Sequence, residues 1–332
     1  MTSQGQQGRI AQEMAPDVYR LELPTPFNVG AVNVYLVKGE KLTLVDVGPL
    51  TGEAWRALTT GLDEIGVSVE EIEQVLLTHH HVDHCGLLER VRKISGAKTL
   101  AHPLAAPYIE LDEEFMDFHD RFFTELYRQS GVPQEKMYII ERFHQLINTF
   151  SEASRIDVHL KHEQIVPGLP QWQVLYTPGH SQSHLSLYRA TDRLMIGGDH
   201  IIKHISSNAF IEPPRDRSGV RPLTLVQYRT ALQMCADMDI EQVLSGHGEP
   251  VLDHRELIFA RLRKNWERTD TLRRMLGGGE KTAYELTALL FPTLYEKELP
   301  LTLSETLGHI DLLTILHQVD VREEGGILYY SV

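Results

Sequence analysis

Hydrophobic and polar residues alternate in short runs through most of the first 250 residues of the chain. The alternation predicts strands at residues 18–23, 33–37 and 42–46, followed by an amphipathic helix over 53–65. Further short strands are predicted at 72–77, 98–102, 173–176, 184–188, 194–196 and 242–244, and the first of these leads into a helix over 86–94. Strands that alternate with helices are typical of α/β proteins, so this part of the chain is expected to have that fold class.

Two stretches interrupt the alternation. The first, residues 104–154, has a helical pattern and is rich in phenylalanine and tyrosine. Because it lies between two predicted core strands, we expect it to form a helical cap over one end of the sheet. Its aromatic side chains would bury the cap against the body, and a few of them would line a substrate pocket.

The second stretch runs from residue 256 to residue 332. Its pattern predicts a long helix over 255–276, a helix from Thr282 to 290, a helix from Ser304 to about 319, and a hairpin over 321–330. Helix, helix and hairpin in this order are typical of a winged-helix-like domain. The helix from Ser304 has no lysine or arginine, which a helix that reads DNA would carry. We therefore expect the tail to serve packing or dimerisation, which favours a homodimer.

The composition narrows the range of partners. The formal net charge is −14, which disfavours nucleic acid and anionic membranes because like charges repel. Two distant cysteines give no disulfide framework, and no apolar run is long enough to cross a bilayer. Residues 1–15 are polar, lack the features of a signal peptide and are expected to be disordered. These features favour a cytoplasmic protein that acts on a small molecule.

The most distinctive chemistry follows the predicted strand at 72–77. His79, His81, Asp83 and His84 stand there in the spacing His-x-His-x-Asp-His. So many imidazoles beside a carboxylate are costly to bury unless a cation binds them, and both groups are good ligands for zinc, iron or manganese. We expect a metal site on a loop at the carboxyl end of this strand, where α/β proteins usually place their chemistry.

Three later segments each place a further candidate ligand at the end of a predicted strand and beside a glycine. These ligands are His180, Asp199 and His247. Glycine next to a ligand lets the backbone turn sharply and approach closely. One Gly–His pair alone is weak evidence, but four such strand ends in one chain indicate a shared site.

The complete ligand set resembles that of the metallo-β-lactamase-fold hydrolases, and Asp46-x-Gly48 after a strand matches their first motif. The resemblance covers about residues 16–255. It implies a four-layer αββα fold in which the cap is an insertion and residues 256–332 form a separate C-terminal domain. It also implies that one metal is held by His79, His81 and His180, the second by Asp83, His84 and His247, and that Asp199 bridges the two.

The same resemblance implies the reaction. His81 stands where the redox branch of this fold usually has glutamate, so the chain resembles the hydrolytic members. Two divalent ions, zinc first and iron or manganese also acceptable, would share a bridging hydroxide that attacks the carbonyl of a small thioester, lactone or ester. Asp83 and Asp199 are the candidate catalytic carboxylates. The segment around His180 resembles glyoxalase II-like thioesterases, whereas the segment around Asp199 and the tail resemble the lactamase-like hydrolase branch.

A different reaction class remains open, because the same kind of centre can stabilise phosphoryl displacement. The alternative is a metal-dependent endoribonuclease or phosphodiesterase. In its favour are the tail and a basic run over residues 261–274, although acidic residues interrupt that run and the net charge opposes it.

Several neighbouring residues have candidate supporting roles. Asp46 could orient a ligand imidazole, or it could be a turn aspartate. His80 should point away from the ligands beside it and be structural, and Cys85 should be a small buried residue rather than a ligand. His184 is expected to hydrogen-bond in the core. His102, His200 and His204 are candidates for contact with substrate.

Overall fold

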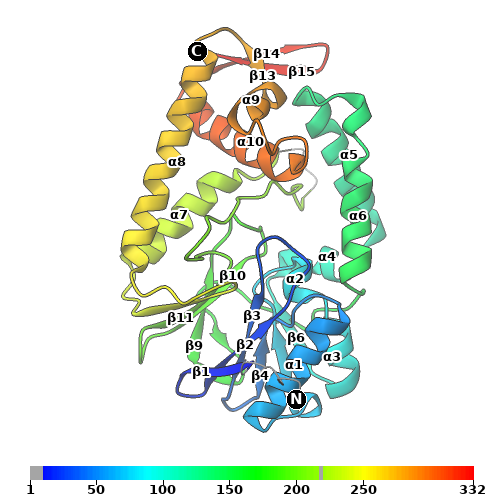
Figure 1. Ribbon diagram of the computed structural model, residues 1–332, viewed down its shortest axis with the longest axis vertical. Coiled ribbons are helices and arrows are strands. Elements are labelled where there is room, and N and C mark those ends of the chain that lie inside the picture. The colour runs from blue at the N-terminus through cyan, green and yellow to red at the C-terminus, as the bar shows by residue number, and fades with distance from the viewer. Residues whose placement is uncertain (1–9, 217–219) are drawn as a thin grey trace, which may run out of the picture.

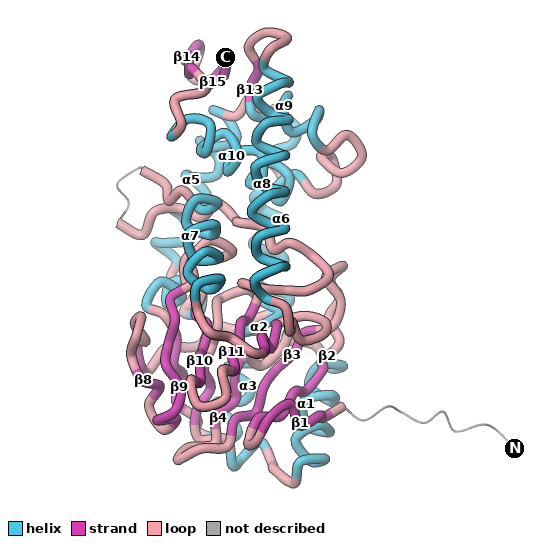
Figure 2. The backbone as a smooth tube through the Cα atoms, turned by 90° about the vertical axis from the view of Figure 1, so that its left-hand side faces the viewer, coloured by secondary structure: helices cyan, strands magenta, loops and turns pink. Residues whose placement is uncertain are grey.

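The computed structural model describes residues 10–216 and 220–332, except for the side chains of residues 143 and 144. Two sheets lie face to face in the lower half of the molecule, and helices cover their outer faces (Figures 1 and 2). Most of the C-terminal elements lie above the sheets in these views, beside the helical cap.

The first sheet has seven strands in the order of the chain. They are β1 (Ala11–Ala15), β2 (Val18–Leu23), β3 (Val32–Val37), β4 (Thr43–Val45), β5 (Gln74–Leu76), β6 (Lys98–Ala101) and β7 (Val158–His159). Neighbours from β1 to β4 are antiparallel and those from β4 to β7 are parallel. Its outer face packs on α1 (Gly52–Ile65) and α3 (Leu88–Ser95), through a cluster that includes Leu58, Leu62 and Val91.

The second sheet has five strands in the order β12-β11-β10-β9-β8. Their bounds are β8 (Ile165–Val166), β9 (Leu169–Tyr176), β10 (Leu185–Arg189), β11 (Leu194–Gly198) and β12 (Gln242–Ser245). Its outer face packs on α7 (Thr224–Asp237) and on the first turns of α8 (His254–Leu276). The two inner faces bury a common apolar core, which includes Tyr35 and Leu76 from one sheet and Leu187 from the other. The four layers are therefore helix, sheet, sheet and helix, as the resemblance implied.

The cap is helical, as the sequence predicted. It contains α4 (Ala106–Ile109), α5 (Glu113–Gln129) and α6 (Ile139–Phe150), together with short 3-10 turns. Part of α5 packs on the C-terminal elements: Phe122, Phe123 and Tyr127 join the apolar cluster that contains Leu303 and Leu307. These aromatic residues therefore tie the cap to the C-terminal part of the chain.

The C-terminal part continues α8 with β13 (Lys281–Thr282), α9 (Ala283–Leu290), α10 (Leu299–Ile315), β14 (Asp320–Glu324) and β15 (Ile327–Ser331). Thr282 and Glu285 form a reciprocal capping box at the start of α9, and β14 and β15 form the predicted hairpin. The predicted start of the third helix at Ser304 is wrong, because α10 begins at Leu299. Pro300 lies in the first turn, where a missing N–H costs no helical hydrogen bond.

The expected disorder at the N-terminus is partly wrong. Residues 1–9 lie outside the described part of the chain, but Ala11–Ala15 form β1 and pair with β2. The backbone N–H of Ala11 also donates to the Glu64 carboxylate of α1, at 2.9 Å.

Among the residues that the structure describes, no helix is both long and apolar enough to cross a membrane.

Candidate metal centre

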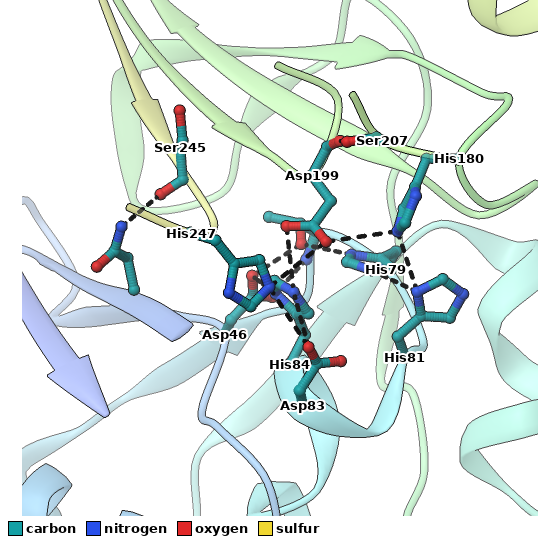
Figure 3. Close-up of polar contacts among 12 residues, drawn as sticks. Asp46, His79, His81, Asp83, His84, His180, Asp199, Ser207, Ser245 and His247 are labelled. Atoms are coloured by element: carbon teal, nitrogen blue, oxygen red, sulfur yellow. Dashed lines mark hydrogen bonds and ion pairs between the residues drawn. The ribbon is translucent and has the colours of Figure 1, made fainter. Parts of the chain in front are cut away.

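The predicted ligands converge at one edge of the two sheets, although they come from four separate segments (Figure 3). His79 and His81 follow β5, His180 follows β9, Asp199 follows β11 and His247 follows β12. Asp83 and His84 lie on the short helix α2 (Val82–Cys85) and not on a loop, so that detail of the prediction is wrong. The backbone carbonyl of His81 starts this helix by accepting from the N–H groups of His84 and Cys85.

Three imidazole nitrogens form the first cluster. His81 Nδ1 lies 3.0 Å from His79 Nε2 and 3.1 Å from His180 Nε2. Ligand atoms of a tetrahedral zinc ion are about 3.3 Å apart when the bonds to the metal have their usual length. The three nitrogens therefore face a common point at nearly the spacing that a metal ion requires.

Asp83, His84 and His247 form the second cluster, whose ligand atoms all lie within 4.8 Å of one another. His247 Nε2 is 3.4 Å from Asp83 Oδ2, and His84 Nε2 is 3.9 Å from the same oxygen. This half of the site adds a carboxylate to two imidazoles, which suits a second divalent cation.

Asp199 lies between the clusters. Its Oδ1 is 3.4 Å from His84 Nε2, and its Oδ2 is 3.5 Å from both His180 Nε2 and His247 Nε2. One carboxylate therefore faces ligands of both groups, as the bridging role predicted from the sequence requires.

Burial and charge act differently on the two clusters. Burial, reinforced by neighbouring imidazoles, holds the pKa of His79 and of His81 well below the usual value, which leaves them neutral. Burial also acts on His84 and His247, but Asp199 and Asp83 outweigh it: the pKa of His84 is raised well above its usual range and that of His247 to about 10. The second cluster therefore attracts positive charge, and a cation that binds there would displace protons.

Buried polar atoms provide a direct test of whether metal ions fit. His84 Nε2, His247 Nε2 and Asp199 Oδ1 are all buried and have no hydrogen-bond partner within the described residues. Leaving such atoms unpaired is costly. All three point into the region between the clusters, so the donor set fits two divalent ions and these atoms would gain partners from them.

The outer nitrogens of the ligand imidazoles are held by acceptors. His84 Nδ1 donates to Asp46 Oδ2 at 2.8 Å, so Asp46 has the position predicted for an acceptor that orients this imidazole. His180 Nδ1 donates to the carbonyl of Asn208 at 2.9 Å, and His247 Nδ1 donates to that of Ala31 at 2.8 Å. In each case the hydrogen bond leaves Nε2 free to face the site.

The residues next to the ligands behave as the sequence indicated. His80 turns away: its Nδ1 is 2.8 Å from Ser183 Oγ, and its ring stacks on Tyr108 with centroids 3.7 Å apart. The buried thiol of Cys85 donates to the carbonyl of His80 at 3.2 Å. His184 lies in the core, where its Nε2 accepts the backbone N–H of Asp199 at 3.0 Å.

The three candidates for substrate contact have different outcomes. His200 has no exposed surface and its ring lies against that of Tyr228, so the predicted contact with substrate is wrong. His102 is partly exposed and stacks on Tyr176 with centroids 4.5 Å apart. His204 is exposed beside Gly248, which follows the ligand His247, so it stays a candidate.

Two residues near the centre were missed because they lie in the irregular segment between β11 and α7. The Phe210 ring packs edge-on against His81 and His180, with centroids 5.3 and 5.5 Å apart. Glu212 is buried, and its Oε1 lies 4.0 Å from His80 Nε2. No periodicity marks either residue, although a carboxylate in a stretch that leads into two prolines offers a weak signal.

Four residues of the basic run on α8 make polar contacts within the chain. Arg261 is buried and donates to the carbonyls of Ile202 and Ile205. Arg268 pairs with Glu305, and Arg273 and Arg274 both pair with Asp270. Because these side chains are engaged within the chain, the run gives little support to a nucleic-acid-binding surface.

Residues 27–247 match the family model described as the Metallo-beta-lactamase superfamily. The chain belongs to this superfamily. It is 40% identical, over 315 residues, to the probable metallo-hydrolase YqjP of Bacillus subtilis (strain 168), with 95% of this chain and 98% of that protein covered. The superfamily and the observed His/Asp cluster make it a metal-dependent hydrolase, as the sequence predicted.

Solved structures extend the likeness to almost the whole chain. A metallo-beta-lactamase family protein from Thermus thermophilus superposes with a TM-score of 0.81 at 25% identity, covering 96% of this chain and 99% of that one. A beta-lactamase domain protein from Burkholderia ambifaria also has a TM-score of 0.81, at 20% identity, covering 97% and 94%. The cap and the C-terminal elements therefore also have counterparts in these two structures.

Proposed function

We propose that this superfamily member is a dinuclear metal-dependent hydrolase that cleaves small thioesters, lactones or esters. The observation that carries the proposal is the position of Asp199, whose two oxygens face ligands of both clusters at 3.4–3.5 Å. A site for a single ion would not need a second buried ligand set on the other side of this carboxylate.

When bound, two divalent ions supply Lewis acidity and a water-derived nucleophile at neutral pH. Zinc is the proposed metal because imidazoles form most of the donor set, and iron or manganese would also accept it. Asp199 and Asp83 neutralise the added positive charge, and Asp46 holds the His84 ring in orientation. Phe210 covers one side of His81 and His180, where it would limit the access of bulk water.

The proposed substrate class follows from the surroundings of the centre. The cap presents Tyr108, which stacks on His80, and Phe115, whose ring centroid is 5.0 Å from that of Tyr108. Both residues line a cavity of about 320 Å³. A cavity of this size and partly apolar lining suits a small substrate rather than a polymer. The acidic net charge points the same way, because it would repel a polyphosphate chain.

The C-terminal part fits the proposal of a winged-helix-like domain used for packing. Two helices, α9 and α10, are followed by a hairpin whose strand β15 also pairs with β13. Most of α10 is buried, so it does not offer a face for a nucleic-acid groove. A homodimer and a cytoplasmic location remain part of the proposal and rest on the sequence alone.

Metal analysis and a substrate panel test the function. We expect about two transition-metal ions per chain, with hydrolysis of thioesters or lactones that falls at least about a hundredfold in Asp199→Ala, because that change removes the shared ligand. Asp239→Ala is the matched control, since this aspartate is exposed and pairs only at the surface with Arg193. Fewer than one metal ion per chain would overturn the dinuclear proposal. Activity on bis-p-nitrophenyl phosphate alone, lost in Asp199→Ala, would replace it with a phosphodiesterase.

A further inference from the structure

A cavity of about 320 Å³ lies between the cap and the segment that joins β11 to α7. The cap contributes Tyr108 and Phe115, and the joining segment contributes Glu212 and the two prolines after it. Pockets that bind small molecules have volumes from about 300 Å³ upward and combine apolar walls with a few polar groups. The cavity has this character, and no predicted metal ligand lines it.

Glu212 is the polar group that distinguishes the cavity. It is only 7% exposed, and its Oε1 accepts the backbone N–H of Gln182 at 2.9 Å. Among the described residues it forms no ion pair with a lysine or arginine, and its nearest basic group is His80 at 4.0 Å. Burial raises the pKa of Glu212 to about 7, and a buried carboxyl without a cationic partner lowers stability. Such a cost is typical of residues kept for binding or catalysis.

The position of Glu212 connects the cavity with the metal centre. Ligand atoms of His80, His81 and Glu212 lie within 4.8 Å of one another, and His81 is a ligand of the first cluster. The Gln182 N–H that binds Glu212 is two residues beyond the ligand His180. A molecule in the cavity would therefore lie one side-chain layer from the reacting centre.

Other charged side chains also line the cavity. Arg221 forms a bidentate pair with Asp311, at 2.6 Å for both contacts. Arg215 and Asp216 carry opposite charges next to each other in the wall. Glu212 is a buried acidic group in the cavity wall, near the ring of Tyr108, which stacks on His80.

We infer that this cavity is a substrate subsite and that Glu212 sets its specificity. Glu212 accepts a hydrogen bond from an amine or hydroxyl on the apolar part of the substrate, which lies away from the scissile carbonyl. The role of the bound molecule as a substrate rests on the proposed function, whereas its binding in the cavity does not. The expected substrate class is an acyl compound whose apolar group carries a hydrogen-bond donor.

Fluorine NMR with para-fluorobenzylamine tests the inference, and para-fluorotoluene serves as the probe that has neither a hydrogen-bond donor nor a group that coordinates metal. The amine should bind the full-length metal-loaded protein and should bind about tenfold more weakly to Glu212→Gln, the scale of one charge-assisted hydrogen bond. Glu241→Gln is the matched control, because this glutamate is exposed and pairs with Arg193 at the surface. Phe115→Leu, which alters the apolar wall, should weaken the amine even if Glu212→Gln folds poorly.

Three outcomes would overturn the inference. The first is equal binding of the amine to wild-type protein and Glu212→Gln, and the second is equal binding of the amine and para-fluorotoluene. The third is loss of amine binding in Asp199→Ala, which would place the probe on the metal ions. The measurement needs no turnover, so a failed subsite and a failed hydrolase function give separate results.

Discussion

The Asp46 carboxylate accepts a hydrogen bond from the candidate ligand His84 at 2.8 Å, and both groups are buried. The same carboxylate accepts the N–H and the hydroxyl of Thr78, each at 2.7 Å. Asp46 adopts a left-handed backbone conformation with φ of +61° to reach this position. The strand end at residue 46 and the strand end that delivers the histidines are thus held together by one side chain.

Asp46→Ala should therefore lose metal from the second cluster before the first. The His84 ring would no longer be oriented, and the affinity of that site should fall by about 10- to 100-fold, the usual effect of removing such a partner. Competition with a chromophoric chelator measures the two affinities. Asp46→Asn keeps an acceptor for the Thr78 N–H and should lose less. An unchanged second affinity in Asp46→Ala would show that Asp46 only closes the turn.

His184 should position the bridging carboxylate. Its Nε2 accepts the N–H of Asp199, and its Nδ1 is 2.8 Å from Thr177 Oγ1. His184→Ala would leave that N–H unpaired in a buried place, so metal affinity should fall by about tenfold in a protein that still folds. Thr177→Val should lower the metal affinity less, because it removes only the hydroxyl next to His184 Nδ1. Equal metal affinity in wild type and His184→Ala would contradict the role.

Metal removal should destabilise the protein more at neutral than at acid pH. The ions would bind the folded state alone, so their removal should lower the melting temperature, and re-addition of zinc should restore it. Protons compete with metal for His84 and His247, whose pKa values are raised and whose neutral forms would be the ligands, so the difference between loaded and chelated protein should shrink as pH falls. Calorimetry with and without chelator checks this. A melting temperature that does not change on chelation at pH 8 would argue against resident metals.

The cluster of candidate ligands was predictable from the sequence because each segment that carries one follows a strand that has a clear hydrophobic pattern. The carboxyl ends of β5, β9, β11 and β12 meet at one edge, so residues far apart in the chain could be placed together. The resemblance added the division into two clusters, which spacing alone does not give. His200 was misplaced because adjacency to Asp199 in the chain says nothing about which side of the backbone a ring takes.

The features that escaped prediction depend on long-range packing. Phe210 and Glu212 have no periodic pattern, and they lie near the centre because Ile211 between them is buried in the C-terminal apolar cluster. Helix α7 was not predicted, and the short strands β1, β7, β8 and β13 were also missed. Strands of two residues carry too few positions for alternation to be visible.

The Arg221–Asp311 pair should hold the segment that bears Glu212 against α10. Both side chains are largely buried, with 18% and 10% of their surfaces exposed. Replacing Asp311 with alanine would leave a partly buried guanidinium unpaired and should cost about 2 kcal/mol of unfolding free energy. Urea unfolding of both single variants and of the double variant measures the coupling. The double variant should be no less stable than the less stable of the two single variants. If the losses of unfolding free energy in the single variants added up in the double variant, the two side chains would not interact directly.

Glu212 should make the stability of the wild-type protein fall as pH rises. Its pKa is about 7 in the folded state and 4.5 when unperturbed, so the folded protein holds the proton more tightly. The stability associated with the protonated form is fully present below pH 4.5 and is lost as pH rises to about 7, with a loss of about 3 kcal/mol. The side chain of Glu212→Gln does not titrate between pH 4.5 and 7. The unfolding free energy of this variant relative to wild type should therefore increase over this pH range and level off at higher pH. Urea titrations of both proteins at pH 4.5, 6 and 8 check this, and a constant difference across the three pH values would refute a raised pKa of the buried carboxyl at this position.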